Sequence, residues 1–262
     1  TWDYLVEVRS LLERHAPGRA LPLWNTEGVK YPCWSGRPGA VRTTGEFVLQ
    51  HKGRNVCASQ GLAAAYVVRD CVIEFCGGAR VLFLWQFRNE LVDMHLPVAE
   101  ALGTVDFFAP DGTPQAKFVA LNALADKLRG ARPIEHFGLS PQVRCTVFER
   151  AQGPFALLWR ENEDESERAF ASYLVPFGTG VTVEDMFGRP IDSKRQDGTQ
   201  AVTISETPVY ILAAQGMAAG ALADEVRKCA SRVAFGADKP LRNTMFGPGR
   251  FGRGKGKRGG DR

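Results

Sequence analysis

The sequence lacks the features that mark several classes of protein. It has no uninterrupted apolar run of about 18 residues, the length that a membrane helix needs, and its richest stretch, residues 56–75, contains three charged side chains and predicts a buried helix. None of the six cysteines forms a C-x-x-C pair, and no histidine stands beside them at metal-ligand spacing. No Gly-rich segment is followed by Lys-Ser/Thr in the Walker spacing. We therefore expect no metal, no cofactor and no membrane span.

The positive charge of the chain is confined to one end. Residues 250–262 hold six Lys and Arg against one Asp, a net +5, and the whole chain carries +4, so the remainder is close to −1. A nearly neutral body gives no reason to expect a nucleic-acid partner, apart from a weak contact by this tail. The tail is a run of Gly and basic residues and is predicted to be disordered. The other end opens at Thr1 without a signal peptide, and we expect this start to be internal to a longer reading frame.

The first half of the sequence alternates between helical and strand-like patterns. Apolar residues recur with helical period over residues 2–15, 56–75 and 113–129. Short apolar runs at residues 20–24 and 80–87 separate these helices and suit strands that are buried on both faces. Helix and strand in alternation predict a parallel sheet with crossover helices.

After Gly130 the pattern changes to short strands separated by turn-forming residues. The predicted strands are residues 143–148, 155–159, 169–175, 181–186, 201–204 and 208–212. Such spacing is typical of an antiparallel β-sandwich. The predicted fold class is therefore α/β plus all-β, with an α/β region at 1–135 and a β-sandwich at 136–215. Residues 216–262 are predicted to hold one helix, at 217–232, and the basic tail.

One segment carries most of the functional information, Leu23-Trp24-Asn25-Thr26-Glu27-Gly28. It places a carboxylate at the end of a predicted buried strand, before a Gly and a long irregular loop. In parallel α/β architectures, functional groups gather where the carboxyl ends of strands meet such loops. A Glu flanked by Asn25 and Thr26 as hydrogen-bond partners can stay ionised and attack the anomeric carbon of a sugar. Alternatively, Glu27 is a solvated loop residue or a helix-capping acid.

Trp-x-Thr-Glu after a short apolar strand resembles the nucleophile strand of clan A retaining glycoside hydrolases, near family 39. The resemblance extends over roughly residues 2–212 and implies a (β/α)8 barrel with a trailing β-sandwich. It implies that Glu27 is the nucleophile at the end of the seventh strand. It also implies that residues 81–87 form the eighth strand and that the ring of Trp85 forms the floor of the sugar subsite. We accordingly expect Trp85, Trp24 and Asn25 to contact a carbohydrate substrate.

The sequence also departs from that family. Only two strand–helix units are visible, whereas a barrel needs eight and about 250 residues. The strand that carries the acid/base Glu of the family is absent, and Asn89-Glu90 follows the eighth strand, so that role is not transferred to Glu90. An upstream half of the barrel is therefore an expected partner. Two other interpretations are a non-catalytic carbohydrate-binding or scaffold protein derived from such an enzyme, and a β-sandwich interaction module.

Overall fold

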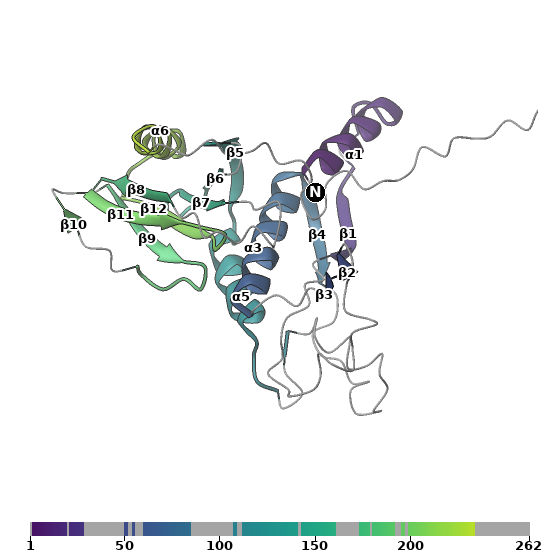
Figure 1. Cartoon of the computed structure of the whole chain (residues 1–262). Coiled ribbons are helices and arrows are strands. Elements are labelled where there is room, and N and C mark those ends of the chain that lie inside the picture. Colours follow the sequence, from purple (N-terminus) through teal and green to yellow (C-terminus); the bar gives the residue numbers. More distant parts are fainter. Residues whose placement is uncertain are drawn as a thin grey trace, which may run out of the picture.

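The structure is a computed structural model, and most of both predicted halves can be followed in it (Figure 1). It describes residues 2–19, 21–28, 50–51, 54–55, 60–84, 107–108, 112–140, 143–160, 173–178, 180–191, 195–196 and 199–233. The predicted basic tail lies outside the described residues. Among the helices that are described, none combines the length and the hydropathy that a membrane span requires.

The α/β half contains the predicted helices and strands in their predicted order, together with two short strands, at 50–51 and 54–55, that were not predicted. Its helices and strands are α1 (Trp2–His15), β1 (Leu23–Gly28), β2 (Gln50–His51), β3 (Arg54–Asn55), α3 (Gln60–Cys76), β4 (Ala79–Leu84) and α5 (Ala116–Leu128). The predicted helix at 2–15 matches α1 at both ends. β1 begins three residues later than the strand predicted at 20–24, and it includes Glu27. The later start is reasonable because Pro22 has no N–H with which to join a ladder.

β1 and β4 form a parallel pair that α3 connects, which is a strand–helix–strand unit. Within the described residues, each of these strands pairs only with the other. The prediction that the first strand is buried on both faces was wrong, because Trp24 is 60% exposed and Leu21 is 40% exposed. Helices cover one face of this pair, while no described element covers the other (Figure 1).

The antiparallel half contains two sheets. Its strands are β5 (Arg132–Gly138), β6 (Val143–Glu149), β7 (Phe155–Arg160), β8 (Tyr173–Phe177), β9 (Val181–Asp185), β10 (Arg195–Gln196), β11 (Thr199–Ile204) and β12 (Val209–Ala213). The larger sheet has the order β5-β6-β7-β12-β9, and the smaller has the order β10-β11-β8. The sequence did not predict β5, an edge strand that contains Pro133 and is half exposed along its length. Edge strands tolerate Pro and need no apolar alternation, so they leave a weak signal in the sequence.

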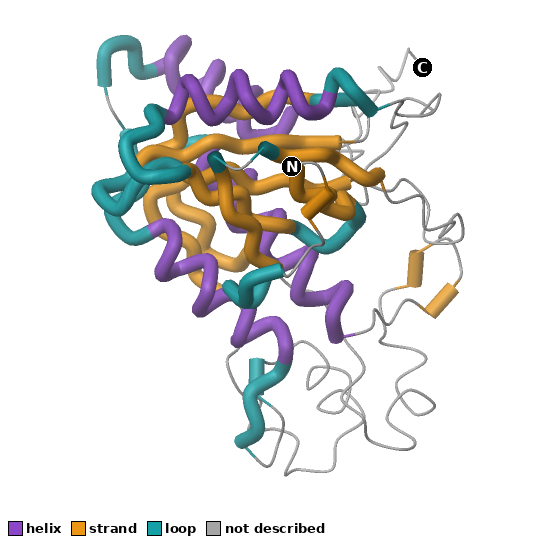
Figure 2. Tube along the Cα trace, turned by 90° about the vertical axis from the view of Figure 1, so that its left-hand side faces the viewer, coloured by secondary structure: helices purple, strands orange, loops and turns teal. Residues whose placement is uncertain are grey.

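The two sheets pack on each other through a shared apolar layer, called here the intersheet core. The helix α6 (Ala219–Ala230) joins this layer, and it runs alongside the strands in Figure 2. Members of the intersheet core include Val143, Cys145, Leu158, Val175, Phe177, Val202, Ile204, Ile211, Leu222 and Val226. The helix predicted at 217–232 is thus present and belongs to the antiparallel half.

The opposite face of the five-stranded sheet packs on α3 and α5, and this second layer is called the helix–sheet core. It includes Ala64, Val68, Val72, Leu124, Phe148, Phe155, Leu157, Trp159 and Tyr210. With both faces covered, β7 and β12 can be almost continuously apolar. The predicted boundary after residue 135 falls inside β5, and the helix–sheet core contains side chains from both halves.

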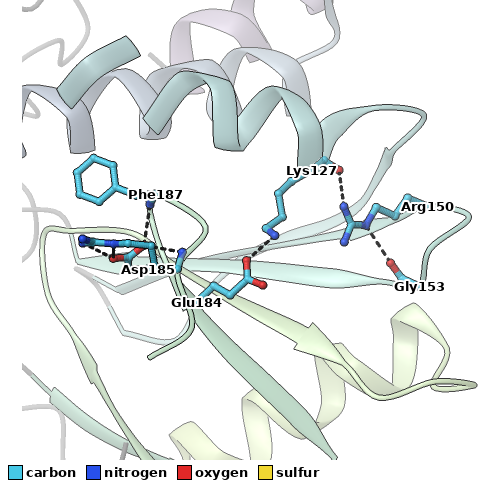
Figure 3. A network of polar contacts seen from close by, with 7 residues as sticks. Lys127, Arg150, Gly153, Glu184, Asp185 and Phe187 are labelled. Atoms are coloured by element: carbon cyan, nitrogen blue, oxygen red, sulfur yellow. Dashed lines mark hydrogen bonds and ion pairs between the residues drawn. The ribbon is translucent and has the colours of Figure 1, made fainter. Parts of the chain in front are cut away.

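A polar network closes the junction between α5 and the sheet (Figure 3). The ammonium of Lys127, at the end of α5, lies 2.5 Å from the Glu184 carboxylate of β9. Arg150 donates from Nη1 to the Lys127 carbonyl and from Nε to the Gly153 carbonyl. Asp185 accepts hydrogen bonds from the backbone N–H groups of Phe187 and Arg189 and pairs with the Arg189 side chain. These contacts connect the carboxyl end of α5 to two turns of the sheet.

Candidate active site

The strand–helix–strand unit places Glu27 near the carboxyl end of β1, beside the carboxyl end of β4. Glu27 is the penultimate residue of β1, and Gly28 pairs in register with Leu84, the last residue of β4. Trp85 follows Leu84 directly but lies outside the described residues, as does the side chain of Glu27. The carboxyl ends of β1 and β4 therefore lie side by side, which is where parallel α/β folds collect functional groups. The predicted substrate contact of Trp85 stays a prediction.

β1 is irregular at the position of Glu27. Asn25 pairs with Leu82 and Gly28 pairs with Leu84, so three steps along β1 match two steps along β4. The extra residue falls between Asn25 and Gly28, which is the segment that holds Thr26 and Glu27. Bulges bend the strand and re-aim side chains, they are rare in parallel pairs, and they are over-represented beside active sites. The irregularity was not visible in the sequence.

The side chain of Asn25 contacts the helix layer. Its Nδ2 donates a hydrogen bond to the carboxylate of Glu74 on α3. Asn25 was predicted as a substrate contact beside Glu27, and no ligand contact of Asn25 is established. Side chains alternate along a strand, so the neighbouring Trp24 belongs to the opposite, exposed face.

Glu74 is a carboxyl group that the sequence reasoning did not select. It is only 6% exposed, although it is an acid on an otherwise apolar stretch of α3. Burial raises its pKa from an ordinary value of 4.5 to about 7, and the nearby charge of Asp70 adds to the increase. The hydrogen bond from Asn25 and the positive charge of the amino terminus act in the opposite direction. The signal in the sequence was an acidic residue one position before Phe75 in a run that predicts a buried helix.

The exposed face of the β1–β4 pair carries two aromatic side chains. The rings of Trp24 and Phe83 have centroids 6.1 Å apart and are tilted by 49°. Trp24 is 60% exposed and Phe83 is 49% exposed. Leu82 and Leu84, on either side of Phe83, pack against the helix–sheet core, so Phe83 lies on the side away from the helices. This pair, named here the aromatic face, can stack on the apolar face of a sugar or on another apolar surface.

The amino-terminal turns of α3 and α5 are joined to each other. The backbone N–H of Ala116 donates to Oε1 of Gln60 over 3.3 Å. Lys117, in the first turn of α5, is 1% exposed, and its ammonium lies 5.5 Å from the centroid of the Phe107 ring. The predicted helix at 113–129 begins later than expected, because Pro114 forms an isolated bridge with Phe108 instead.

The described part of the chain offers no metal site. There, no three His, Cys, Asp or Glu side chains gather closely enough to hold a metal ion. Glu90 and Asp93 lie outside the described residues. The described site therefore consists of the carboxyl end of β1, the aromatic face and the buried Asn25–Glu74 pair.

Comparison with known proteins finds similarity among solved structures. No family model matches the sequence, and no curated protein matches it. Among solved structures, the chain is similar to a family 39 glycoside hydrolase from the gut symbiont Bacteroides cellulosilyticus WH2, with a TM-score of 0.51 and 13% sequence identity. The similarity covers 81% of this chain and 37% of that chain. The chain thus shares the fold of somewhat more than a third of that glycoside hydrolase.

Proposed function

We propose that this chain is a glycoside hydrolase-like protein built from the last part of a (β/α)8 barrel and a trailing β-sandwich. In this proposal β1 and β4 are the seventh and eighth barrel strands, within residues 1–135. The sandwich comprises residues 136–215, the first residues of β5 (from Arg132) and the helix α6. The parallel strand–helix–strand unit and the structural likeness to a family 39 glycoside hydrolase support the proposal.

The proposed chemistry is retaining hydrolysis of an O-glycosidic bond with Glu27 as the nucleophile. The carboxylate would attack the anomeric carbon and displace the leaving oxygen, giving a covalent glycosyl-enzyme that water then hydrolyses. No cofactor takes part in these steps. The single observation that carries the assignment is the position of Glu27, within a bulge at the carboxyl end of β1 and beside the end of β4. Trp24 and Trp85 are the proposed substrate contacts, whereas the Asn25 side chain donates a hydrogen bond to Glu74 in the helix layer and would support the strand.

The proposed reaction needs a second carboxyl group about 5–5.5 Å from the first, as the general acid. No residue of this sequence stands at the place of the family's acid/base Glu, because Asn89-Glu90 follows the eighth strand. We therefore propose that an upstream part of the barrel completes the site and pairs with the edges of β1 and β4 that have no partner among the described strands. Hydrolysis of glycosides by this chain alone would then be weak.

The nucleophile can be tested by covalent trapping. The protein is incubated with a panel of 2,4-dinitrophenyl 2-deoxy-2-fluoro glycosides, whose good leaving group reduces the need for an acid, and is then digested for mass spectrometry. We expect the added mass of one fluorosugar on the peptide that contains Glu27. Glu27→Gln should abolish the label, while Glu7→Gln, an exposed acid on α1, should leave it unchanged. Labelling at another carboxylate, or labelling that survives Glu27→Gln, would refute the assignment.

A second candidate function is carbohydrate binding without catalysis, which the exposed aromatic face favours. In that case an oligosaccharide would bind with no turnover, and Trp24→Ala would weaken binding while Glu27→Gln would not. Isothermal titration calorimetry measures binding by the two variants, and fluoroglycoside labelling detects the nucleophile. Binding without labelling would indicate the non-catalytic function.

A further inference from the structure

The buried carboxyl group of Glu74 has no part in the proposed reaction, and its position requires a reason. Removing a carboxyl group from water costs free energy unless hydrogen bonds or charges compensate. Glu74 lies on a helix whose neighbouring residues Cys71 and Val72 are buried and apolar, so an apolar side chain would suit the same packing. Its carboxylate accepts a hydrogen bond from Asn25 of β1. The acid therefore joins α3 to a particular residue of the strand.

Asn25 and Trp24 are the two consecutive residues of β1 that are in register with β4, because the register also shifts between Leu23 and Trp24. Asn25 is the last residue in register with β4 before the extra residue, and the next registered pair is Gly28 with Leu84. A bulge that is fixed only by backbone pairing can move one position along a strand, and a shift of one residue reverses which face each side chain occupies. A side-chain hydrogen bond at Asn25 opposes such a shift, because Nδ2 can reach Glu74 only in one register.

We propose that Glu74 is a positioning residue for Glu27. Its hydrogen bond with Asn25 would fix the position of the bulge near the carboxyl end of β1, and with it the orientation of Glu27. The role assigned to Glu27 rests on the proposed function, whereas the anchoring of β1 does not. Glu74 acts only through Asn25 and the backbone, and it contacts no reacting atom in this proposal.

The anchor makes a prediction about local order in β1. Loss of the hydrogen bond should let residues 26–28 exchange between registers, while α3 keeps its packing on the helix–sheet core. Glu74→Leu removes the acceptor and keeps an apolar volume, and Glu74→Gln keeps an oxygen acceptor for Asn25. Val68→Ala is the matched control, because Val68 is also fully buried on α3 and carries no polar group that could anchor β1.

Amide hydrogen exchange, read at single residues by NMR, tests the anchor. We expect Glu74→Leu to lower the protection of the Glu27 and Gly28 amides by about tenfold beyond any change in Val68→Ala, as loss of one hydrogen bond implies. Glu74→Gln should restore protection to within about threefold of the wild type. Equal losses in Glu74→Leu and Val68→Ala, or no rescue by Gln, would overturn the proposal. If Glu74→Leu does not fold, Asn25→Ala removes the other partner and should give the same local loss, and unchanged protection in that variant would also overturn it.

A second readout links the anchor to chemistry. Labelling by the fluoroglycosides that react with Glu27 should slow by at least about tenfold in Glu74→Leu and recover in Glu74→Gln. A wild-type chain that never becomes labelled would count against the proposed function, while the exchange data would still decide whether Glu74 anchors β1. Labelling that is equally fast in Glu74→Leu would show that the anchor does not position Glu27.

Discussion

The rings of Trp24 on β1 and Phe83 on β4 lie 6.1 Å apart on the one face of this strand pair that no described element covers. Both strands also have an outer edge without a partner among the described strands. Exposed aromatic side chains next to open strand edges are a common setting for association with another surface. In the proposed fold, this face is directed to the interior of the barrel.

The aromatic face should make the isolated chain associate. We expect sedimentation velocity to show concentration-dependent self-association, and Trp24→Ser combined with Phe83→Ser to reduce it. Leu174→Ser is the control, because Leu174 is equally exposed, at 60%, but lies on β8 in the other half of the protein. A monodisperse monomer at all concentrations would argue against an incomplete barrel.

The ion pair between Lys127 and Glu184 should stabilise the junction of the two halves. Their side chains are only 12% and 18% exposed, and the Lys127 ammonium also lies 5.3 Å from the centroid of the Tyr210 ring. Lys127→Met leaves a largely buried carboxylate without its cation, so we expect a loss of about 2–4 kcal/mol in the free energy of unfolding, measured with urea. Adding Glu184→Leu should recover part of that loss. Arg129→Ala, which breaks an ion pair between exposed side chains, should change stability little.

Glu74 should make the stability of the protein depend on pH. Its pKa is about 7 in the folded protein and close to 4.5 when exposed, so the unfolded chain releases this proton first. The contribution of Glu74 to stability is therefore fully present below pH 4.5 and is lost as the pH rises towards about 7. Glu74→Gln cannot ionise, and relative to the wild type it should gain about 1–3 kcal/mol between pH 5 and pH 8.

This pH effect can be checked through the neighbouring acid. The charge of Asp70 contributes to the raised pKa of Glu74, after burial, while Asn25 and the amino terminus oppose it. Asp70→Asn should lower the pKa of Glu74 and reduce the stability difference between the wild type and Glu74→Gln. Urea titrations at several pH values measure both effects. A difference that is independent of pH would show that Glu74 does not hold its proton in the folded state.

Catalysis by the chain alone should depend strongly on the leaving group. General acid catalysis contributes about 10²–10⁴-fold, and an activated aryl glycoside loses least when the acid is absent. We expect no hydrolysis of natural oligosaccharides and at most slow release of 2,4-dinitrophenol, abolished in Glu27→Gln. Rapid hydrolysis of an unactivated oligosaccharide would indicate that another carboxylate, with Glu90 and Asp93 as candidates, serves as the acid.

The buried thiols should be chemically inert in the folded protein. Burial raises the pKa of Cys71 and Cys145 far above the ordinary value and that of Cys76 to about 12. Because the thiolate is the nucleophile, we expect iodoacetamide at pH 8 to modify these three at least about tenfold more slowly than glutathione, and rapidly in urea. Peptide mass spectrometry after timed alkylation measures the rates. Fast modification of Cys145 in the native protein would contradict its burial between the sheets.

Local patterns in the sequence predicted most of the elements but not all of their ends. The helical period at residues 2–15 matches α1, and the apolar runs at residues 143–148 and 155–159 lie within β6 and β7. The edge strand β5 was missed, because it lacks a regular apolar alternation and carries Pro133. The start of β1 was predicted three residues early, because apolar residues alone do not show where backbone pairing begins.

The sequence by itself determined the order of the longer helices and of most strands, and the location of Glu27 near the end of a strand, since both depend on residues that are close along the chain. Only the tertiary structure decided that Asn25 meets Glu74, that the register of β1 shifts beside Glu27, and that Trp24 is exposed. Each of these depends on which distant element packs on or pairs with β1. An apolar run shows that a strand can be buried. Which face is covered, which register is adopted and how the pKa of a neighbouring acid shifts depend on packing between segments far apart in the sequence.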